Sequence, residues 1–283
     1  MSKQRSPSKG FTLLELVMVM VLLGVMAVGI TSFVSLTTQT YVNVSARDEL
    51  IASARFVVER LNREIRNAVP NSVRVKSGTF AGIDIQCLEF APIVASTIYT
   101  DIPVAPDPLS DTLTVIEFNG QDGNDYQCAG FCLDSVAVYP LTPDDIFANQ
   151  TDATGKVFGL KSVTQTTPAE WTLTLDRASG VSFDADSPTE RLYITRSPVS
   201  FCVADNRMFR YENYAFTANQ LTPPFAPAVT MADNLDNMNT GDLPFTLLPA
   251  TLQRNAMVQV KLNFLLNDES IVFNNEIHIA NVP

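Results

Sequence analysis

Glu15 is the side chain of this sequence whose chemistry most needs an explanation. It lies near the start of the apolar segment at residues 11–34, and no other charged side chain occurs from residue 16 to residue 46. An isolated carboxylate inside a bilayer is costly unless a group of opposite charge pairs with it. Glu15 is therefore a candidate for a specific ion pair.

The four cysteines Cys87, Cys128, Cys132 and Cys202 are the other groups with distinctive chemistry. An even number of cysteines on the oxidising side of a membrane favours disulfides. Three pairings are possible, and we favour a short ring between Cys128 and Cys132 together with a Cys87–Cys202 bond. The spacing matches no zinc motif, so we expect no metal there.

The sequence holds no pattern typical of catalysis. Its single histidine, His278, lies in a strand pattern opposite to Ile277 and Ile279, and no Gly-x-Ser-x-Gly motif or phosphate-binding glycine loop is present. Residues 119–125 (NGQDGND) and 233–242 are rich in oxygen ligands. Their spacing does not fit an EF-hand loop, so we interpret both as solvated turns and expect neither an enzyme nor a bound cofactor.

Charge divides the chain into a basic start and an acidic remainder. The formal net charge is −11, which argues against a nucleic-acid-binding face. The first ten residues are basic, with Lys3, Arg5 and Lys9 and no acid. Because basic residues before an apolar segment stay on the cytoplasmic side, we expect the acidic remainder on the other side of the membrane.

The apolar segment at residues 11–34 is about as long as a membrane span, which needs roughly 20 residues. A secretory signal peptide with a cleavage site at residues 27–29 (AVG) is one alternative. A plain single-span anchor is another. Neither alternative explains an acid one turn into the span.

Residues 10–15 (GFTLLE), after a basic leader, resemble the processing site of type IV prepilins and of type II secretion pseudopilins. The resemblance implies that a prepilin peptidase cuts between Gly10 and Phe11 and methylates the new N-terminus at Phe11. It also implies that Glu15, the fifth residue after the cut, neutralises the terminal amine of a neighbouring subunit during assembly.

The same resemblance implies the partners and the location of the protein. The partners are the prepilin peptidase, other pilin subunits and the pilus assembly machinery. The location is the bacterial inner membrane, crossed once with the head in the periplasm, and afterwards a pilus or pseudopilus.

A helical pattern continues beyond the span. Apolar residues three or four apart between Leu50 and Ala68 form one face, and arginines and glutamates form the opposite face. Because no proline occurs between Pro7 and Pro70, we expect one helix over residues 11–69. The alternative is two helices with a break at residues 37–40 (TTQT), where threonines form helix poorly.

Residues 53–75 extend the resemblance. They are similar to the stem of MshO-type minor pilins of mannose-sensitive haemagglutinin (MSHA) pili. J-type pseudopilins and W-type minor pilins share a similar stem.

From residue 72 onward, short strand patterns alternate with Pro, Asn and Asp turns. Trp171 lies in one of these patterns, and we interpret it as a core residue. Residues 218–243, rich in Pro, Asn and Asp, are expected to be loop. The strand patterns cover residues 113–118, 135–139, 171–175, 191–195, 199–203, 208–211, 258–264 and 271–279, of which the last two form a hairpin around a turn at 267–269.

These patterns predict an α+β protein with a long N-terminal helix on a mainly antiparallel sheet. We expect a cytoplasmic leader at residues 1–10, a helix at 11–70 and a β-rich head at 71–283. The helix comprises a membrane span at about 11–34 and a stem at about 35–70. So large a head favours a minor pilin that initiates or caps a filament. The alternatives are a J-type pseudopilin of a type II secretion system, a membrane-tethered binding or adhesion module, or, more distantly, an anchored enzyme.

Overall fold

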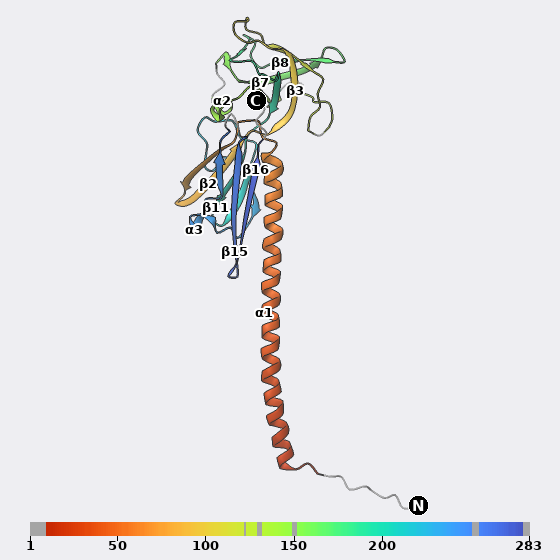
Figure 1. The fold of residues 1–283 in the computed structure, drawn as a ribbon, viewed down its shortest axis with the longest axis vertical. Helices are drawn as coiled ribbons and strands as arrows, with labels where there is room; N and C mark the ends of the chain where they lie inside the picture. The colour runs from red at the N-terminus through yellow and green to blue at the C-terminus, as the bar shows by residue number, and fades with distance from the viewer. Residues whose placement is uncertain (1–9, 122, 129–131, 149–151, 251–254, 280–283) are drawn as a thin grey trace, which may run out of the picture. The chain divides into compact units, whose positions relative to one another are not determined.

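The computed structural model describes residues 10–121, 123–128, 132–148, 152–250 and 255–279 (Figure 1). One long helix, α1 (Leu13–Ile65), is followed by strands that pair almost entirely antiparallel. The α+β fold expected from the sequence is therefore confirmed. The chain divides into two compact units after residue 49, so α1 contributes residues to both.

α1 is a single helix, as predicted, and the break considered at residues 37–40 is absent. The helix ends four residues earlier than the predicted residue 69. After Ile65 the N–H of Ala68 donates three residues back, to the carbonyl of Ile65, and the N–H of Val69 donates to the carbonyl of Ala91. The chain thus leaves helical geometry after Ile65, and the backbone of Val69 pairs with that of Ala91.

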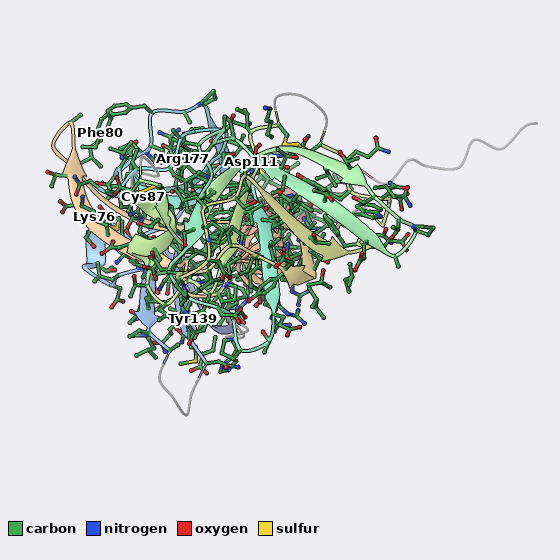
Figure 2. The ribbon with its side chains drawn as sticks, turned by 90° about the horizontal axis from the view of Figure 1, so that it is seen from above. Lys76, Phe80, Cys87, Asp111, Tyr139 and Arg177 are labelled. Carbon is green, nitrogen blue, oxygen red and sulfur yellow. A yellow bond between two sulfur atoms is a disulfide. The ribbon has the colours of Figure 1, made fainter. Side chains whose placement is uncertain are left out.

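Two antiparallel sheets lie beside the second part of α1, residues 50–65. The larger has the order β1-β2-β11-β12-β13, and the smaller has the order β14-β15-β16. Their bounds are β1 (Arg74–Phe80), β2 (Ile83–Phe90), β11 (Val199–Ala204), β12 (Arg207–Tyr211), β13 (Ala228–Ala232), β14 (Phe245–Leu248), β15 (Met257–Leu266) and β16 (Glu269–His278). Figure 2 labels Lys76, Phe80 and Cys87 on the β1–β2 hairpin.

The apolar face of α1 and the two sheets enclose one core. Leu50, Ala54, Val57, Leu61 and Ile65 of the helix are at most 1% exposed. They pack in one cluster with buried aromatic residues of four strands: Phe90, Phe201, Phe245 and Phe264. The amphipathic stripe predicted for this part of the helix is therefore confirmed.

A closed barrel forms a second core within the same unit. Its strands have the order β10-β3-β4-β8-β7-β5, and Trp171 is buried among its apolar side chains, as expected for a core residue. The bounds are β3 (Ile93–Asp101), β4 (Thr112–Ile116), β5 (Ser135–Val138), β7 (Val157–Gln165), β8 (Glu170–Leu175) and β10 (Arg191–Thr195). A short parallel pair, β6 (Thr154–Gly155) and β9 (Ser182–Phe183), accompanies it.

In place of the single antiparallel sheet expected from the sequence, the head has two such sheets and a barrel. The barrel occupies the chain between β2 and β11, yet β2 and β11 are direct neighbours in the larger sheet. The chain therefore leaves the sheet, builds a second domain-like body, and returns to the strand beside the one it left.

Two short helices, α2 (Pro143–Phe147) and α3 (Asn237–Thr240), complete the fold. The expectation that residues 218–243 are loop is wrong in part, because β13 and α3 lie within them. The predicted turn of the final hairpin is confirmed. Asn267 and Asp268 join β15 to β16 with positive φ angles of 50° and 64°, as two-residue hairpin turns require.

Candidate processing and assembly site

Gly10 and Phe11 lie just before the first turn of α1, where the sequence predicts processing. Both are exposed, and Phe11 is 72% exposed. A Cβ atom added at Gly10 would meet no other atom within 4 Å. The peptide bond between the two residues is therefore open to approach from outside the chain. The basic residues of the leader lie outside the described residues.

Thr12 caps the helix and connects this site to Glu15. The backbone N–H of Glu15 donates to the Thr12 hydroxyl oxygen at 3.3 Å, and the N–H of Leu16 donates to the Thr12 carbonyl at 3.2 Å. Thr12-x-x-Glu15 is the capping-box pattern, in which the side chain at the N-cap satisfies a free N–H of the first turn. Thr12 was not among the predicted site residues, although its spacing to Glu15 is readable in the sequence.

Glu15 is an exposed residue in the first turn of α1. A carboxylate is favourable there, because the free N–H groups of a helix N-terminus carry partial positive charge. Its side chain makes no hydrogen bond or ion pair with any described residue. Gly10 and Phe11 precede α1 and Glu15 lies in its first turn, but the roles assigned to these residues remain predictions.

Large apolar side chains cover the surface of α1 from its start to residue 44. All residues from 10 to 45 are exposed, among them Leu22 at 60% and Phe33 at 69%. This part of α1 is long and apolar enough to cross a membrane. So much apolar surface is unfavourable in water and requires lipid or other protein to cover it.

Threonines within this surface keep their hydroxyl groups bonded inside the helix. The hydroxyl groups of Thr37, Thr38 and Thr40 each donate to the carbonyl four residues earlier, at 2.8–2.9 Å, and Thr31 does the same at 2.7 Å. This back-bonding satisfies the polar groups without water. α1 continues through residues 37–40 with these hydroxyl groups satisfied inside the helix.

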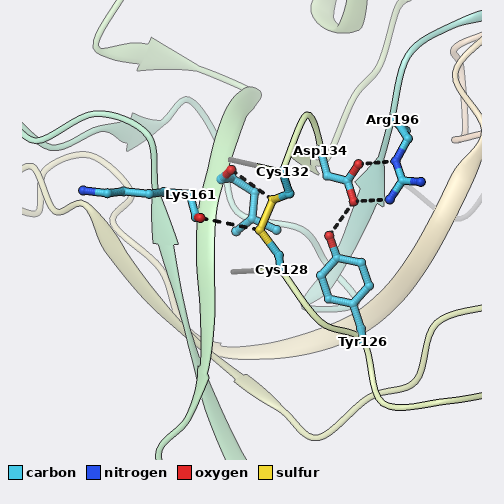
Figure 3. Close-up of a disulfide and its surroundings, with 7 residues drawn as sticks. Tyr126, Cys128, Cys132, Asp134, Lys161 and Arg196 are labelled. Carbon is cyan, nitrogen blue, oxygen red and sulfur yellow. Dashed lines mark hydrogen bonds and ion pairs between the residues drawn. A yellow bond between two sulfur atoms is a disulfide. The ribbon is translucent and has the colours of Figure 1, made fainter. Parts of the chain in front are cut away.

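The cysteines form the favoured pairing. Cys87 is bonded to Cys202 and Cys128 to Cys132. Cys87 and Cys202 are opposite each other in the β2–β11 register, so this bond joins the two strands between which the barrel is inserted. The Cys128–Cys132 bond closes a loop of the barrel, and its sulfur atoms lie 3.5 and 3.3 Å from the carbonyl oxygens of Lys161 and Leu160 (Figure 3).

A buried carboxylate lies beside the Cys128–Cys132 bond (Figure 3). Asp134 is 2% exposed and accepts hydrogen bonds from the Tyr126 hydroxyl at 2.6 Å and from two guanidinium nitrogens of Arg196 at 2.5 and 2.9 Å. Burial and the Asp134 carboxylate raise the pKa of Tyr126. The phenol therefore stays protonated and serves as a structural donor.

A second buried carboxylate, Glu89, is held on the outer face of the larger sheet. It accepts hydrogen bonds from Arg74 at 2.5 Å and from the Tyr214 hydroxyl at 2.9 Å. Arg74 also donates to the carbonyls of Thr217 and Ala218 at 2.8 Å. These bonds tie the segment after β12 across the sheet. No sequence pattern indicated this network, because Arg74 and Glu89 lie more than 100 residues before their partners in the segment after β12.

The oxygen-rich stretches and His278 were the other features considered for metal binding or catalysis. Among the described residues, no group of three or more His, Cys, Asp or Glu side chains could hold a metal ion. Asp122, in the 119–125 stretch, lies outside the described residues. His278 is exposed while Ile277 is buried, which agrees with the predicted alternation along the last strand.

Residues 5–31 match the family model of the prokaryotic N-terminal methylation motif. Comparison with curated proteins and with solved structures found no match. The matched residues contain the Gly10–Phe11 bond, Glu15 and the start of the exposed apolar helix. This motif, on an apolar N-terminal helix that is followed by antiparallel sheets, supports a type IV pilin-like or pseudopilin subunit anchored in a membrane.

Proposed function

We propose that this chain is a minor pilin of a type IV, MSHA-like pilus that helps to initiate or cap the filament. A prepilin peptidase cuts after Gly10 and methylates the amine of Phe11. The apolar surface of α1 is covered first by the inner membrane, with the head in the periplasm, and then by the helices of other subunits. The observation that carries this proposal is the methylation motif at the start of a helix whose apolar side chains are exposed from residue 13 to residue 45.

Glu15 is the assembly residue in this proposal. Processing creates a cationic amine on Phe11, four residues from the Glu15 carboxylate. In a filament the amine of one subunit pairs with Glu15 of the next, and pairing is what makes two charges tolerable in an apolar environment. The two disulfides favour an oxidising location for the head.

Mass spectrometry of the N-terminus tests the processing step. Expressed with a prepilin peptidase, the chain should begin at Phe11 and carry one additional methyl group. Gly10→Val should block processing, because a branched side chain then occupies the cleavage position. Gly24→Val is the matched control, since a Cβ there also meets no atom within 4 Å. A chain that keeps Met1, or that begins near Gly29, would contradict the proposal.

Substitution of Glu15 tests the assembly step separately. Glu15→Ala should leave processing intact but reduce incorporation into filaments by roughly 100-fold, because the buried amine of the neighbour loses its partner. Glu15→Asp keeps the charge and should retain part of the incorporation. If the native chain, Glu15→Ala and Glu15→Asp are incorporated equally well, the proposed pairing is refuted.

A membrane-tethered binding module is the second candidate. The inserted barrel favours it, because the helix and its two sheets already form a complete core without those strands. A J-type pseudopilin of a type II secretion system is the alternative within the same family. Co-purification of neighbouring subunits with the tagged chain separates these cases, since pilus, pseudopilus and tether imply different companions.

A further inference from the structure

A small cationic cavity lies where the chain leaves α1 and meets the barrel. Its volume is about 310 Å³, and its lining contains Arg66 and Arg191 but no acidic residue among those that the structure describes. The chain as a whole carries a net charge of −11. A cavity with two cations and no acid is therefore unusual for this protein.

The two arginines differ from most of those in the adjacent, larger cavity of about 920 Å³, whose lining also contains Glu64, Asp125 and Glu212. There Arg60, Arg196 and Arg210 each form an ion pair with a carboxylate, and Arg63 is the one arginine of that lining without an ion pair to a described residue. The Arg66 side chain, in contrast, makes no ion pair or hydrogen bond with any described residue. Arg191 contacts the Tyr193 hydroxyl, but its Nε atom is buried without a hydrogen-bond partner among the described residues.

Helix electrostatics explain only one of these arginines. A cation just after the end of α1 is favourable because the last carbonyls of a helix carry partial negative charge, and this accounts for Arg66. Arg191 is the first residue of β10, in the barrel. Its Nε atom is buried without a partner among the described residues, so the guanidinium charge is partly desolvated, and an anion beside this group in the cavity would stabilise that charge.

Neutral polar side chains complete the lining. Asn67 and Gln121 both donate their amide N–H groups to the carbonyl of Ile93, which fixes their amide oxygens as acceptors. Asn119 and Ser96 also line the cavity. Such groups suit hydroxyl groups, and the volume lies at the lower end of the range for small-molecule sites.

We propose that this cavity binds an acidic sugar, with its carboxylate at Arg66 and Arg191 and its hydroxyl groups at the neighbouring amides. A guanidinium group matches a carboxylate with two parallel hydrogen bonds. The proposal concerns residues 66–193 alone and does not depend on processing or filament assembly.

Isothermal titration calorimetry on the full chain in detergent micelles tests the proposal with three probes. Glucuronate supplies ring and carboxylate, glucose the ring alone, and acetate the carboxylate alone. Glucuronate should bind at least tenfold more tightly than either of the others. No detectable binding of glucuronate, or equal binding of acetate or glucose, would overturn the proposal.

Variants locate the binding site. Arg66→Gln and Arg191→Gln should each weaken glucuronate binding about tenfold or more, as expected for loss of a charge-assisted hydrogen bond. Arg207→Gln is the matched control, because Arg207 is a charged residue of β12 that does not line this cavity. Unchanged binding in Arg66→Gln would overturn the assignment, and this exposed position keeps the test valid even if Arg191→Gln fails to fold.

Discussion

The two parts of α1 both carry large apolar side chains but bury them differently. From residue 13 to residue 45 every side chain is exposed, whereas Leu50, Leu61 and Ile65 are at most 1% exposed within the head. The second part is stabilised by the sheets that cover it. The first part has no cover within the chain, so its environment must come from lipid or from other subunits. The two parts of one continuous helix thus require different environments.

The largest expected effect on stability comes from the disulfides, and both of them lie in the head. Replacing Cys87 and Cys202 by alanine should lower the free energy of unfolding of the head by about 5 kcal/mol, since the bond closes a loop with a sequence separation of 115 residues. Removing the Cys128–Cys132 bond, with a separation of 4 residues, should cost only about 2 kcal/mol. Denaturant titration followed by Trp171 fluorescence and circular dichroism measures both. Equal losses would contradict the loop-entropy argument.

A matched pair of leucine substitutions tests the two parts of the helix directly. Leu61→Ala should destabilise the head by about 2–5 kcal/mol, because it opens a cavity in the core. Leu22→Ala, at a side chain that is 60% exposed, should change head stability by less than about 0.5 kcal/mol. Urea titration of both variants in the same micelles makes the comparison. A similar loss of stability in both variants would show that the head does not depend on residues 50–65 more than on the exposed part of α1.

The pH dependence of the head should show the effect of Glu89. Burial raises the pKa of this carboxyl above 4.5, even though Arg74 and Tyr214 act to lower it. Because the folded pKa is raised, the stabilising contribution of protonation is complete below the unfolded pKa and is lost as the pH rises through the folded pKa. Each pH unit between the two pKa values corresponds to about 1.4 kcal/mol.

Glu89→Gln isolates this effect. The free energy of unfolding of the native chain, relative to that of Glu89→Gln, should fall as the pH rises from below 4.5 toward neutrality. Denaturant titrations at several pH values measure the difference between the two chains. A difference that stays constant over this range would show that the pKa of Glu89 is not raised.

The smallest effect is expected in the exposed part of the helix. Thr38→Ala removes a hydroxyl that, within the described part of the chain, bonds to the carbonyl of Val34 alone, and alanine is the better helix former. Helix content in micelles, measured by circular dichroism, should therefore change little or rise slightly. A marked loss of helix would mean that this hydroxyl has a structural role beyond its own turn.

The elements that the sequence predicted best are governed by local patterns. The spacing from Leu50 to Ala68 indicated the buried stripe of α1, and Asn267–Asp268 indicated the last hairpin, because helix periodicity and turn chemistry act over a few residues. Gly10, Phe11 and Glu15 were also readable as a short motif. Their proposed chemistry still depends on partners outside the chain.

The barrel and the polar networks were not predictable in this way. Closure of the barrel depends on pairing β10 with both β3 and β5, and no local pattern specifies partners so distant in sequence. The same holds for Glu89, whose partners Arg74 and Tyr214 come from different segments. The cationic cavity likewise arises only when residue 66 and residue 191 meet in the fold.

The insertion of the barrel between two bonded strands has a mechanical consequence. When the chain is pulled between α1 and its C-terminal hairpin, tension passes from β2 to β11 through the Cys87–Cys202 bond, and the segment between these cysteines carries none of it. That segment, with a sequence separation of 115 residues, would add about 400 Å of extended chain once released. Under reducing conditions single-molecule stretching should gain this length, whereas under oxidising conditions the barrel should stay folded while the rest of the head extends.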